Sequence, residues 1–422
     1  MKTARIVSVI LLLCALALVA LAWPRTRMVP STSPADYAAT SQNIARGAYL
    51  ARAGDCIACH TARGGVAYAG GRALDTPFGR FYGPNLTPDI DTGIGDWHAD
   101  DFWNALHNGV AKDGRLLYPA FPYTHYTRVT RPDADALYAY FMSLPPQRQA
   151  NRPHELDFPY NQPMLLAGWR LLYFRPGDIE AQPARGLAWN RGAYLVEGLG
   201  HCSACHSTRN PLGALKEGLD GGMMPTLGWY APSLTSSGEA GLGDWEQDHI
   251  VALLGSGISP RGAATGPMAE VVARSLQYLT RDDLEAMAVY LKSLPATPAP
   301  TPERAPSAGK QVLLEGGRIY ASQCAQCHGD DGQGKLPAYP PLAGNRAVTL
   351  TPAVNAIRMT VNGGFPPGTG GNPRPYGMPP FGHELNDAQV AAVLSWIRTS
   401  WGNAAPPVTA VEVNRYRAIT DN

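Results

Sequence analysis

Apolar residues recur along the chain in a pattern that predicts three similar helical segments. Each segment opens with a short helix-like stretch, continues through loops rich in Gly and Pro, and closes with an amphipathic helix whose apolar residues fall at three-to-four spacing. The opening stretches are expected at residues 46–55, 191–201 and 316–323, and the closing helices at residues 133–145, 282–295 and 386–401. The pattern predicts a mainly α protein with three small domains in tandem.

The length of the chain gives the same domain count, because 422 residues exceed one compact core and suggest roughly three domains. The expected division is 1–30 as a membrane-directing segment, 40–146 as domain one, 147–184 as a linker, 185–296 as domain two, 297–308 as a Pro-rich linker, 309–403 as domain three and 404–422 as a C-terminal tail. The first linker contains an apolar run, 164–174, that is too short to span a membrane and is expected to form a helix packed between domains. Because the second linker is rich in proline, it is expected to be an extended spacer, and the third domain is expected to be loosely attached.

The N-terminus directs the chain to a membrane. Lys2 and Arg5 precede the apolar run 6–23, which fits either a cleaved signal peptide or a retained anchor. In both cases the rest of the chain is expected to be exported, which in a bacterium means the periplasmic face of the cytoplasmic membrane. Cys14 lies inside this run and is interpreted as a passive apolar residue.

Charge argues against nucleic acid as a partner. Acidic and basic residues nearly cancel, at a formal net charge of +1. No cluster of Lys and Arg forms the basic stripe that neutralises phosphates.

Six cysteines repeat one motif. The motif reads CIACH at residues 56–60, CSACH at 202–206 and CAQCH at 324–328. Disulfides or zinc could also use six cysteines, but neither requires a histidine directly after each second cysteine. C-x-x-C-H is the attachment signal for c-type haem, in which two thiols bond the porphyrin and the histidine binds the iron. The predicted haem-bearing residues are Cys56, Cys59, Cys202, Cys205, Cys324 and Cys327, and the predicted iron ligands are His60, His206 and His328.

A turn led by proline follows each motif, at Pro84, Pro232 and Pro341. A carbonyl in such a turn can accept the second ring N–H of the ligating histidine and orient the ring. The alternative is an ordinary surface turn.

Methionines in two Gly/Pro loops are the candidate sixth ligands of the second and third haems. Met268 lies in GPMAEVV and Met378 in YGMPPFG, each shortly before a closing helix. A thioether ligand raises the potential of a haem. Met287 and Met359 lie in helical surroundings and are expected to pack in the core.

The first domain has Phe121 where this methionine would stand, and phenylalanine cannot bind iron. His125, in the same loop, is the preferred ligand, with His98 and His107 as rivals. If His125 binds, the first haem has two imidazoles and the lowest potential. If nothing binds, the iron is five-coordinate and open to small molecules.

Further motifs carry a family resemblance. They are RGAYL at 46–50 and 191–195, LYPAFPYTHYT at 117–127, GWYAPSLT at 228–235, GDW at 95–97 and 243–245, and GPMAEVVARSLQYLT at 266–280. With the three haem motifs, the chain resembles the triple-haem cytochrome c subunit of bacterial membrane-bound dehydrogenases that oxidise alcohols, gluconate, sorbitol or aldehydes. The resemblance implies three class I-like cytochrome c domains, each wrapped around a covalent haem c and joined by Pro-rich linkers. It implies electron transfer from a catalytic subunit to ubiquinone or a terminal oxidase.

Phe121 affects the expected partner. Family members paired with quinoprotein or flavin dehydrogenases typically have methionine there, whereas a phenylalanine with a following histidine is similar to cytochromes paired with molybdenum hydroxylase-type dehydrogenases. These oxidise aldehydes or N-heterocycles through iron–sulfur clusters, and such a partner is preferred over a PQQ alcohol dehydrogenase or a flavin gluconate or sorbitol dehydrogenase. No catalytic residue of this chain's own is expected. The alternative of another class is a multihaem peroxidase or gas-binding cytochrome with an open first haem.

Overall fold

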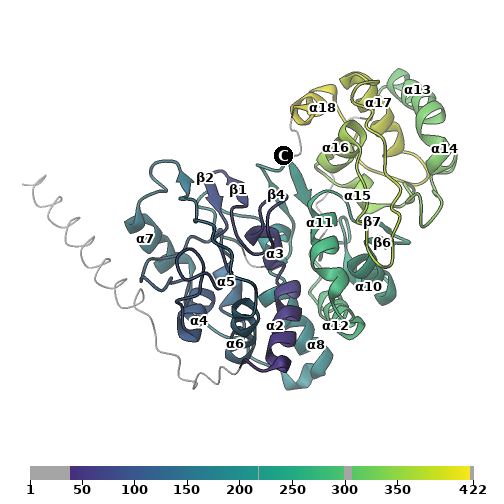
Figure 1. Cartoon of the computed structure of the whole chain (residues 1–422). Coiled ribbons are helices and arrows are strands. Elements are labelled where there is room, and N and C mark those ends of the chain that lie inside the picture. Colours follow the sequence, from purple (N-terminus) through teal and green to yellow (C-terminus); the bar gives the residue numbers. More distant parts are fainter. Residues whose placement is uncertain (1–38, 217, 299–306, 419–422) are drawn as a thin grey trace, which may run out of the picture. The chain divides into compact units, whose positions relative to one another are not determined.

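The computed structural model describes residues 39–216, 218–298 and 307–418, which form mostly helices and a few short strands (Figure 1). The described residues divide into two compact units, one within 39–181 together with 194–201 and one within 182–193 together with 202–418. The N-terminal apolar run and most of the Pro-rich linker lie outside the described residues. Within the described ranges, no helix is both long enough and apolar enough to cross a membrane.

The first unit surrounds the first haem motif with helices. Its elements are α2 (Ser41–Ala53), α3 (Cys56–His60), β1 (Ala73–Thr76), β2 (Gly79–Tyr82), α4 (Ala99–Asn108), α5 (Tyr123–Tyr126), α6 (Arg131–Met142), β3 (Glu155–Leu156), α7 (Pro163–Tyr173) and the π-helical η3 (Tyr194–Leu199). The strands form one antiparallel sheet in the order β1-β2-β3.

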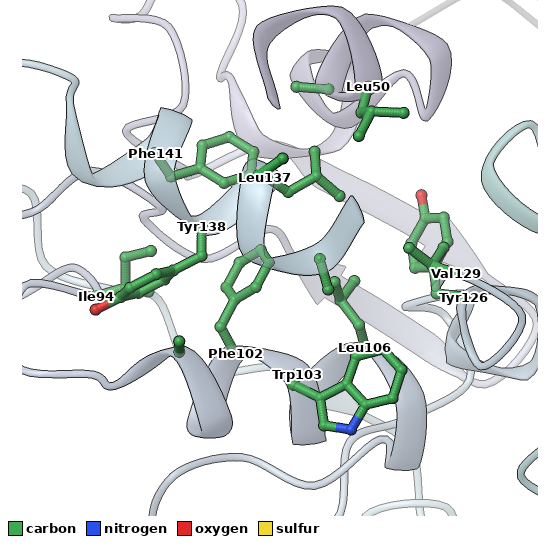
Figure 2. Close-up of a cluster of buried hydrophobic side chains, with 14 of the residues drawn as sticks. Leu50, Ile94, Phe102, Trp103, Leu106, Tyr126, Val129, Leu137, Tyr138 and Phe141 are labelled. Atoms are coloured by element: carbon green, nitrogen blue, oxygen red, sulfur yellow. The ribbon is translucent and has the colours of Figure 1, made fainter. Parts of the chain in front are cut away.

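The hydrophobic core of the first unit lies between α2, α4 and α6. Figure 2 shows Leu50 of α2 facing Leu137 and Phe141 of α6, with Phe102 of α4 on the other side of them. Phe102 and Phe141 contact each other with ring centroids 5.9 Å apart. Cys56 packs at the edge of this core, so the first haem motif borders the main hydrophobic cluster.

The second unit holds the other two motifs. Its elements up to the Pro-rich linker are η2 (Pro183–Arg185), α8 (Gly186–Ala193), α9 (Ser203–His206), β4 (Gly222–Met224), β5 (Trp229–Ala231), η4 (Leu242–Asp244), α10 (Gln247–Ser256), β6 (Ile258–Ser259), β7 (Gly262–Ala263), α11 (Pro267–Arg274), η5 (Leu276–Tyr278) and α12 (Arg281–Lys292). After the linker come α13 (Lys310–Ile319), the π-helical η6 (Tyr320–Cys324), α14 (Ala325–His328), α15 (Arg346–Thr349), α16 (Val354–Asn362), α17 (Asp387–Ile397) and α18 (Ala410–Arg417).

A glycine lets the opening helix cross the closing helix closely in each repeat. The crossing pairs are α2 with α6, α8 with α12, and α13 with α17. A Cβ built on Gly47 would lie 1.9 Å from the carbonyl oxygen of Ala136, one on Gly192 2.0 Å from that of Ala286, and one on Gly316 2.2 Å from that of Ala392. No side chain fits at such distances. The recurrence confirms that the three segments share one helix-crossing geometry.

An ion pair accompanies the crossing in the first two repeats. Arg46 donates from Nε to Asp133 at 2.6 Å, and Arg191 donates from Nε and Nη2 to both oxygens of Asp283 at 2.8 Å. The third repeat has Glu315 in place of the arginine. The first two domains therefore share an ion pair at the helix crossing that the described residues of the third domain lack.

The second and third domains contact each other within the second unit, contrary to the expected loose attachment. The Thr369 hydroxyl donates to the Ser256 carbonyl at 3.0 Å, and the Gly370 N–H donates to the Gln277 side chain at 3.2 Å. The Pro-rich composition of a linker predicts only the conformation of the linker itself. It does not reveal the polar contacts that the domains make elsewhere.

The C-terminal tail ends in a docked helix. In α18, Val413 is fully buried and Arg417 donates from Nη1 to Gly382 at 2.6 Å and from Nη2 to Leu385 at 2.9 Å. The buried Arg398 binds the segment that leads to this helix, donating from Nε to Pro406 at 2.9 Å. The tail is therefore part of the third domain's packing.

Candidate haem sites

Each C-x-x-C-H motif lies on a short helix directly after the opening helix of its repeat. The motifs occupy α3, the segment 202–206 that ends in α9, and the segment 324–328 that ends in α14. Residues three apart on a helix lie on the same face, so both thiols of a pair can reach one porphyrin edge. None of these six cysteines is paired in a disulfide. Burial raises the pKa of Cys56 to about 12 and that of Cys324 to about 11, so these thiols are protonated at neutral pH.

The three motif histidines have the same orientation. Nδ1 of His60 donates to the carbonyl of Pro84 at 2.8 Å, and Nδ1 of His206 donates to the carbonyl of Pro232 at 2.8 Å. This is the support predicted from the proline-led turns. The bond orients the ring and leaves Nε2, the other ring nitrogen, as the atom that would bind a haem iron.

The third domain departs from the prediction by one residue. His328 donates to Pro340 at 3.1 Å, not to Pro341. Two prolines follow one another here, and the structural counterpart of Pro84 is the first of them, because each supporting proline stands two residues before a leucine. Sequence reasoning selected the proline next to that leucine.

The histidine environments fit a haem ligand. Burial lowers the pKa of His60, His206 and His328, so each imidazole is neutral at pH 7. A neutral, oriented imidazole beside two thiols on one helix face is the donor set that covalent haem c requires. Once bound, a haem supplies one-electron chemistry between Fe(II) and Fe(III).

Met378 lies in a fixed loop beside the third motif. Its N–H donates to Gly364 at 2.8 Å and its carbonyl accepts from Gly364 at 3.0 Å. Its side chain packs against the third-domain core together with Cys324. Met359 of α16 approaches the same loop, with Sδ 3.5 Å from where a Cβ on Gly364 would be. Both thioethers therefore lie near this loop.

Met268 lies in the first turn of α11, not in the loop that the sequence predicted. The Gly-Pro pair before it starts that helix, since Pro267 suits the first helical position. The side chain is half-buried. Met287 is buried in α12, as expected of a core residue.

Phe121 packs against the first-unit core, against which Cys56 and Ile57 of the first motif also pack. In the third domain, Met378 and Cys324 likewise both pack against the core. His125, one turn further along in α5, is only 5% exposed. Its Nδ1 lies 3.3 Å from the carbonyl oxygen of Glu197.

The setting of His125 is not that of a solvated loop histidine. Its ring is buried, and its Nδ1 faces a backbone carbonyl, the arrangement that orients the motif histidines. Of its rivals, His98 is exposed, and His107 stacks on Trp103 at 4.4 Å between ring centroids.

One histidine near the first motif was missed. No repeated motif singles out His201. Its ring packs edge-on against Tyr126 with ring centroids 5.6 Å apart, and Tyr126 donates to the Gly54 carbonyl at 3.2 Å. Burial lowers the pKa of His201. Its position directly before Cys202 was the available signal, but the contact joins residues far apart in sequence.

Comparison with known proteins agrees with this geometry. Residues 44–145 and 313–401 match the family model described as cytochrome c. These ranges contain the first and third motifs, their closing helices and most of their opening helices. The fold and the sites therefore define a cytochrome c protein with a mainly helical structure.

Curated relatives extend the match to nearly the whole chain. The chain is 42% identical to the gluconate 2-dehydrogenase cytochrome c subunit of Pantoea cypripedii, over 91% of each protein. It is 39% identical to the cytochrome c subunit of alcohol dehydrogenase (quinone) of Gluconacetobacter polyoxogenes, over 90% of this chain and 85% of that one. It is 41% identical to a subunit of nicotinate dehydrogenase from Pseudomonas putida, over 95% of this chain and 34% of that longer protein. The chain belongs to the family of dehydrogenase cytochrome c subunits.

Proposed function

We propose that the chain transfers electrons through three covalently bound haems c, from a catalytic dehydrogenase subunit to ubiquinone or a terminal oxidase of the respiratory chain. The observation that carries the proposal is the repeated site: a C-x-x-C-H motif whose histidine donates to a proline carbonyl, found in all three domains. The second domain has this arrangement as fully as the other two. A count of three haems is therefore proposed over the two that the matched family segments alone would give.

Each haem would be held by two thioether bonds and one histidine. The proposed attachment residues are Cys56, Cys59, Cys202, Cys205, Cys324 and Cys327, with His60, His206 and His328 as proximal ligands. Met268 and Met378 are proposed as the sixth ligands in the second and third domains. Because thioether ligation raises the potential, these haems would accept electrons from the first.

The comparisons favour the partner that the sequence ranked second. Relatives named for gluconate 2-dehydrogenase and alcohol dehydrogenase (quinone) match over most of their own length. We therefore propose an alcohol or sugar-acid dehydrogenase of the quinoprotein or flavin type. A molybdenum hydroxylase-type partner acting on an N-heterocycle is the second candidate, supported by the similarity to the nicotinate dehydrogenase relative.

Membrane association at the periplasmic face is proposed on two features. One is the N-terminal apolar run 6–23. The other is α7, which buries only Leu166 and Arg170, while its Met164 and Leu172 are 71% and 69% exposed. Exposed apolar surface of this kind is typical of an interaction site. The helix predicted in the linker is thus present with much of its apolar surface open.

Purification of the full chain from membranes tests the function. A catalytic subunit should co-purify, and its substrate should reduce the haem of the complex, seen as a sharpened α-band in the visible spectrum. Added ubiquinone analogue should then reoxidise it. A chain that purifies alone and turns over hydrogen peroxide would instead support the peroxidase alternative.

His125→Ala should make one haem of the oxidised protein high-spin, because the proposed imidazole ligand is lost. The expected fraction is about one third of the total haem, since each domain carries one. Electronic spectra and electron paramagnetic resonance measure it. The matched control is His98→Ala, which removes an exposed histidine of the same domain and should leave every haem low-spin. A low-spin His125→Ala protein would assign the ligand elsewhere.

A further inference from the structure

A buried arginine of the third domain lies against the second domain. Arg358 of α16 is 1% exposed, and its guanidinium carbon lies 5.0 Å from the ring centroid of Trp229 in β5. Asn355, on the preceding turn of α16, holds the strand in register. Its Oδ1 accepts from the Tyr230 N–H at 2.9 Å, and its Nδ2 donates to the Tyr230 carbonyl at 2.7 Å. The position of the arginine relative to β5 is therefore fixed by two hydrogen bonds.

Trp229 lies next to two segments that flank the second haem motif. It stands three residues before Pro232, whose carbonyl orients His206. A Cβ built on Gly266 would lie 2.8 Å from the indole ring, so the ring packs directly on the backbone at Gly266. Gly266 stands two residues before Met268. The indole thus joins the segment that supports the proximal histidine to the segment that carries the proposed distal methionine.

The guanidinium brings a permanent positive charge to this place. Arginine stays protonated in proteins, and attraction to the face of an indole helps to hold its guanidinium there. A charge in a buried setting acts with a low effective dielectric constant and is screened little by salt. Reduction of a haem iron removes one positive charge, so a nearby cation favours Fe(II) over Fe(III).

We propose that Arg358 raises the reduction potential of the haem in the neighbouring second domain. The inference rests on the proposed haem at Cys202 and Cys205. In this proposal a residue of the third domain adjusts the reduction potential of the haem in the second domain. With its potential raised in this way, the second haem is a better acceptor for electrons from the first.

Arg358→Gln tests the charge, with Arg358→Lys as the matched control that keeps it. In spectroelectrochemical titration, Arg358→Gln should shift one haem to lower potential. Because one buried positive charge is lost, the ratio of reduced to oxidised haem at the original midpoint should fall about tenfold. Arg358→Lys should stay close to the unaltered protein. The first-domain haem is the internal reference and should not move.

Several outcomes would overturn the proposal. These are an unchanged titration in Arg358→Gln, equal shifts in the Gln and Lys variants, and a shift confined to the first-domain haem. The shifted transition must also be the one that disappears when Cys202 and Cys205 are replaced by serine. If Arg358→Gln fails to fold, Arg358→Met gives the same test, because its unbranched apolar chain fills similar space.

Failure of the proposed function gives a separate result. If peptide mapping of the unaltered protein found no porphyrin on residues 202–206, both the proposed second haem and the role of Arg358 would be wrong. A fully loaded protein with an unmoved potential would overturn only the role of Arg358.

Discussion

Replacing both Cys202 and Cys205 by serine should lower the covalent haem content of the chain from three haems to two. Serine cannot form the thioether bonds, and His206 alone would hold a haem only by its iron. The pyridine haemochrome assay counts haem per chain, and the intact mass should fall by one porphyrin. Peptide mapping should place the loss on residues 202–206. This experiment bears directly on the second domain, the one outside the matched cytochrome c segments.

Cys14→Ser is the control for the cysteine substitutions. It changes the one cysteine outside the three motifs and should leave the haem content at its original value. If the double serine variant kept all its haem, or if the unaltered chain carried two haems from the start, the second motif would not be an attachment site. The proposed three-haem relay would then lose its middle member.

The repeats could be predicted from the sequence because they depend on local patterns. Apolar spacing places the closing helices, and the motif places each histidine after a helix. The proline support followed from the same repeats for Pro84 and Pro232. For the third motif the prediction named Pro341, whereas His328 donates to the carbonyl of Pro340. Two adjacent prolines stand here, and only their spacing from the following leucine, compared across the repeats, distinguishes them.

Contacts between distant residues could not be predicted in this way. The closeness of Gly192 to Ala286 follows from how two helices cross, although the repeated RGAYL was a visible signal that a glycine is needed there. The contact of Arg358 with Trp229 has no counterpart in any motif. It arises where two repeats meet, and a pattern within one repeat carries no information about its neighbour.

The first haem site contains one feature that a local pattern predicts and one contact between distant residues that it does not. Counting back from the closing helix places Phe121 where a methionine would stand, and in the structure Phe121 and Cys56 both pack against the first-unit core. The burial of His125 and its approach to Glu197 could not be predicted, because η3 lies far along the chain. The sequence could suggest a histidine but not its surroundings.

Gly192→Ala should destabilise the second domain strongly, because α8 and α12 cross so closely that the added methyl group has no room. The new Cβ would meet the Ala286 carbonyl oxygen at 2.0 Å and Cβ of Tyr290 at 2.8 Å. Neither atom is the end of a flexible side chain, so α8 and α12 must move apart. We expect a loss of about 3 kcal/mol in the free energy of unfolding, measured by urea titration followed by circular dichroism.

Gly168→Ala is the matched control for this prediction. Gly168 lies inside α7, and a Cβ there would meet nothing within 4 Å. Alanine should leave the urea midpoint unchanged or raise it slightly, because it reduces the freedom of the unfolded chain. Equal midpoints for the two variants would mean that the helices cross less closely than the structure has them. The shared geometry of the three repeats would then lose its support at Gly47 and Gly316 as well.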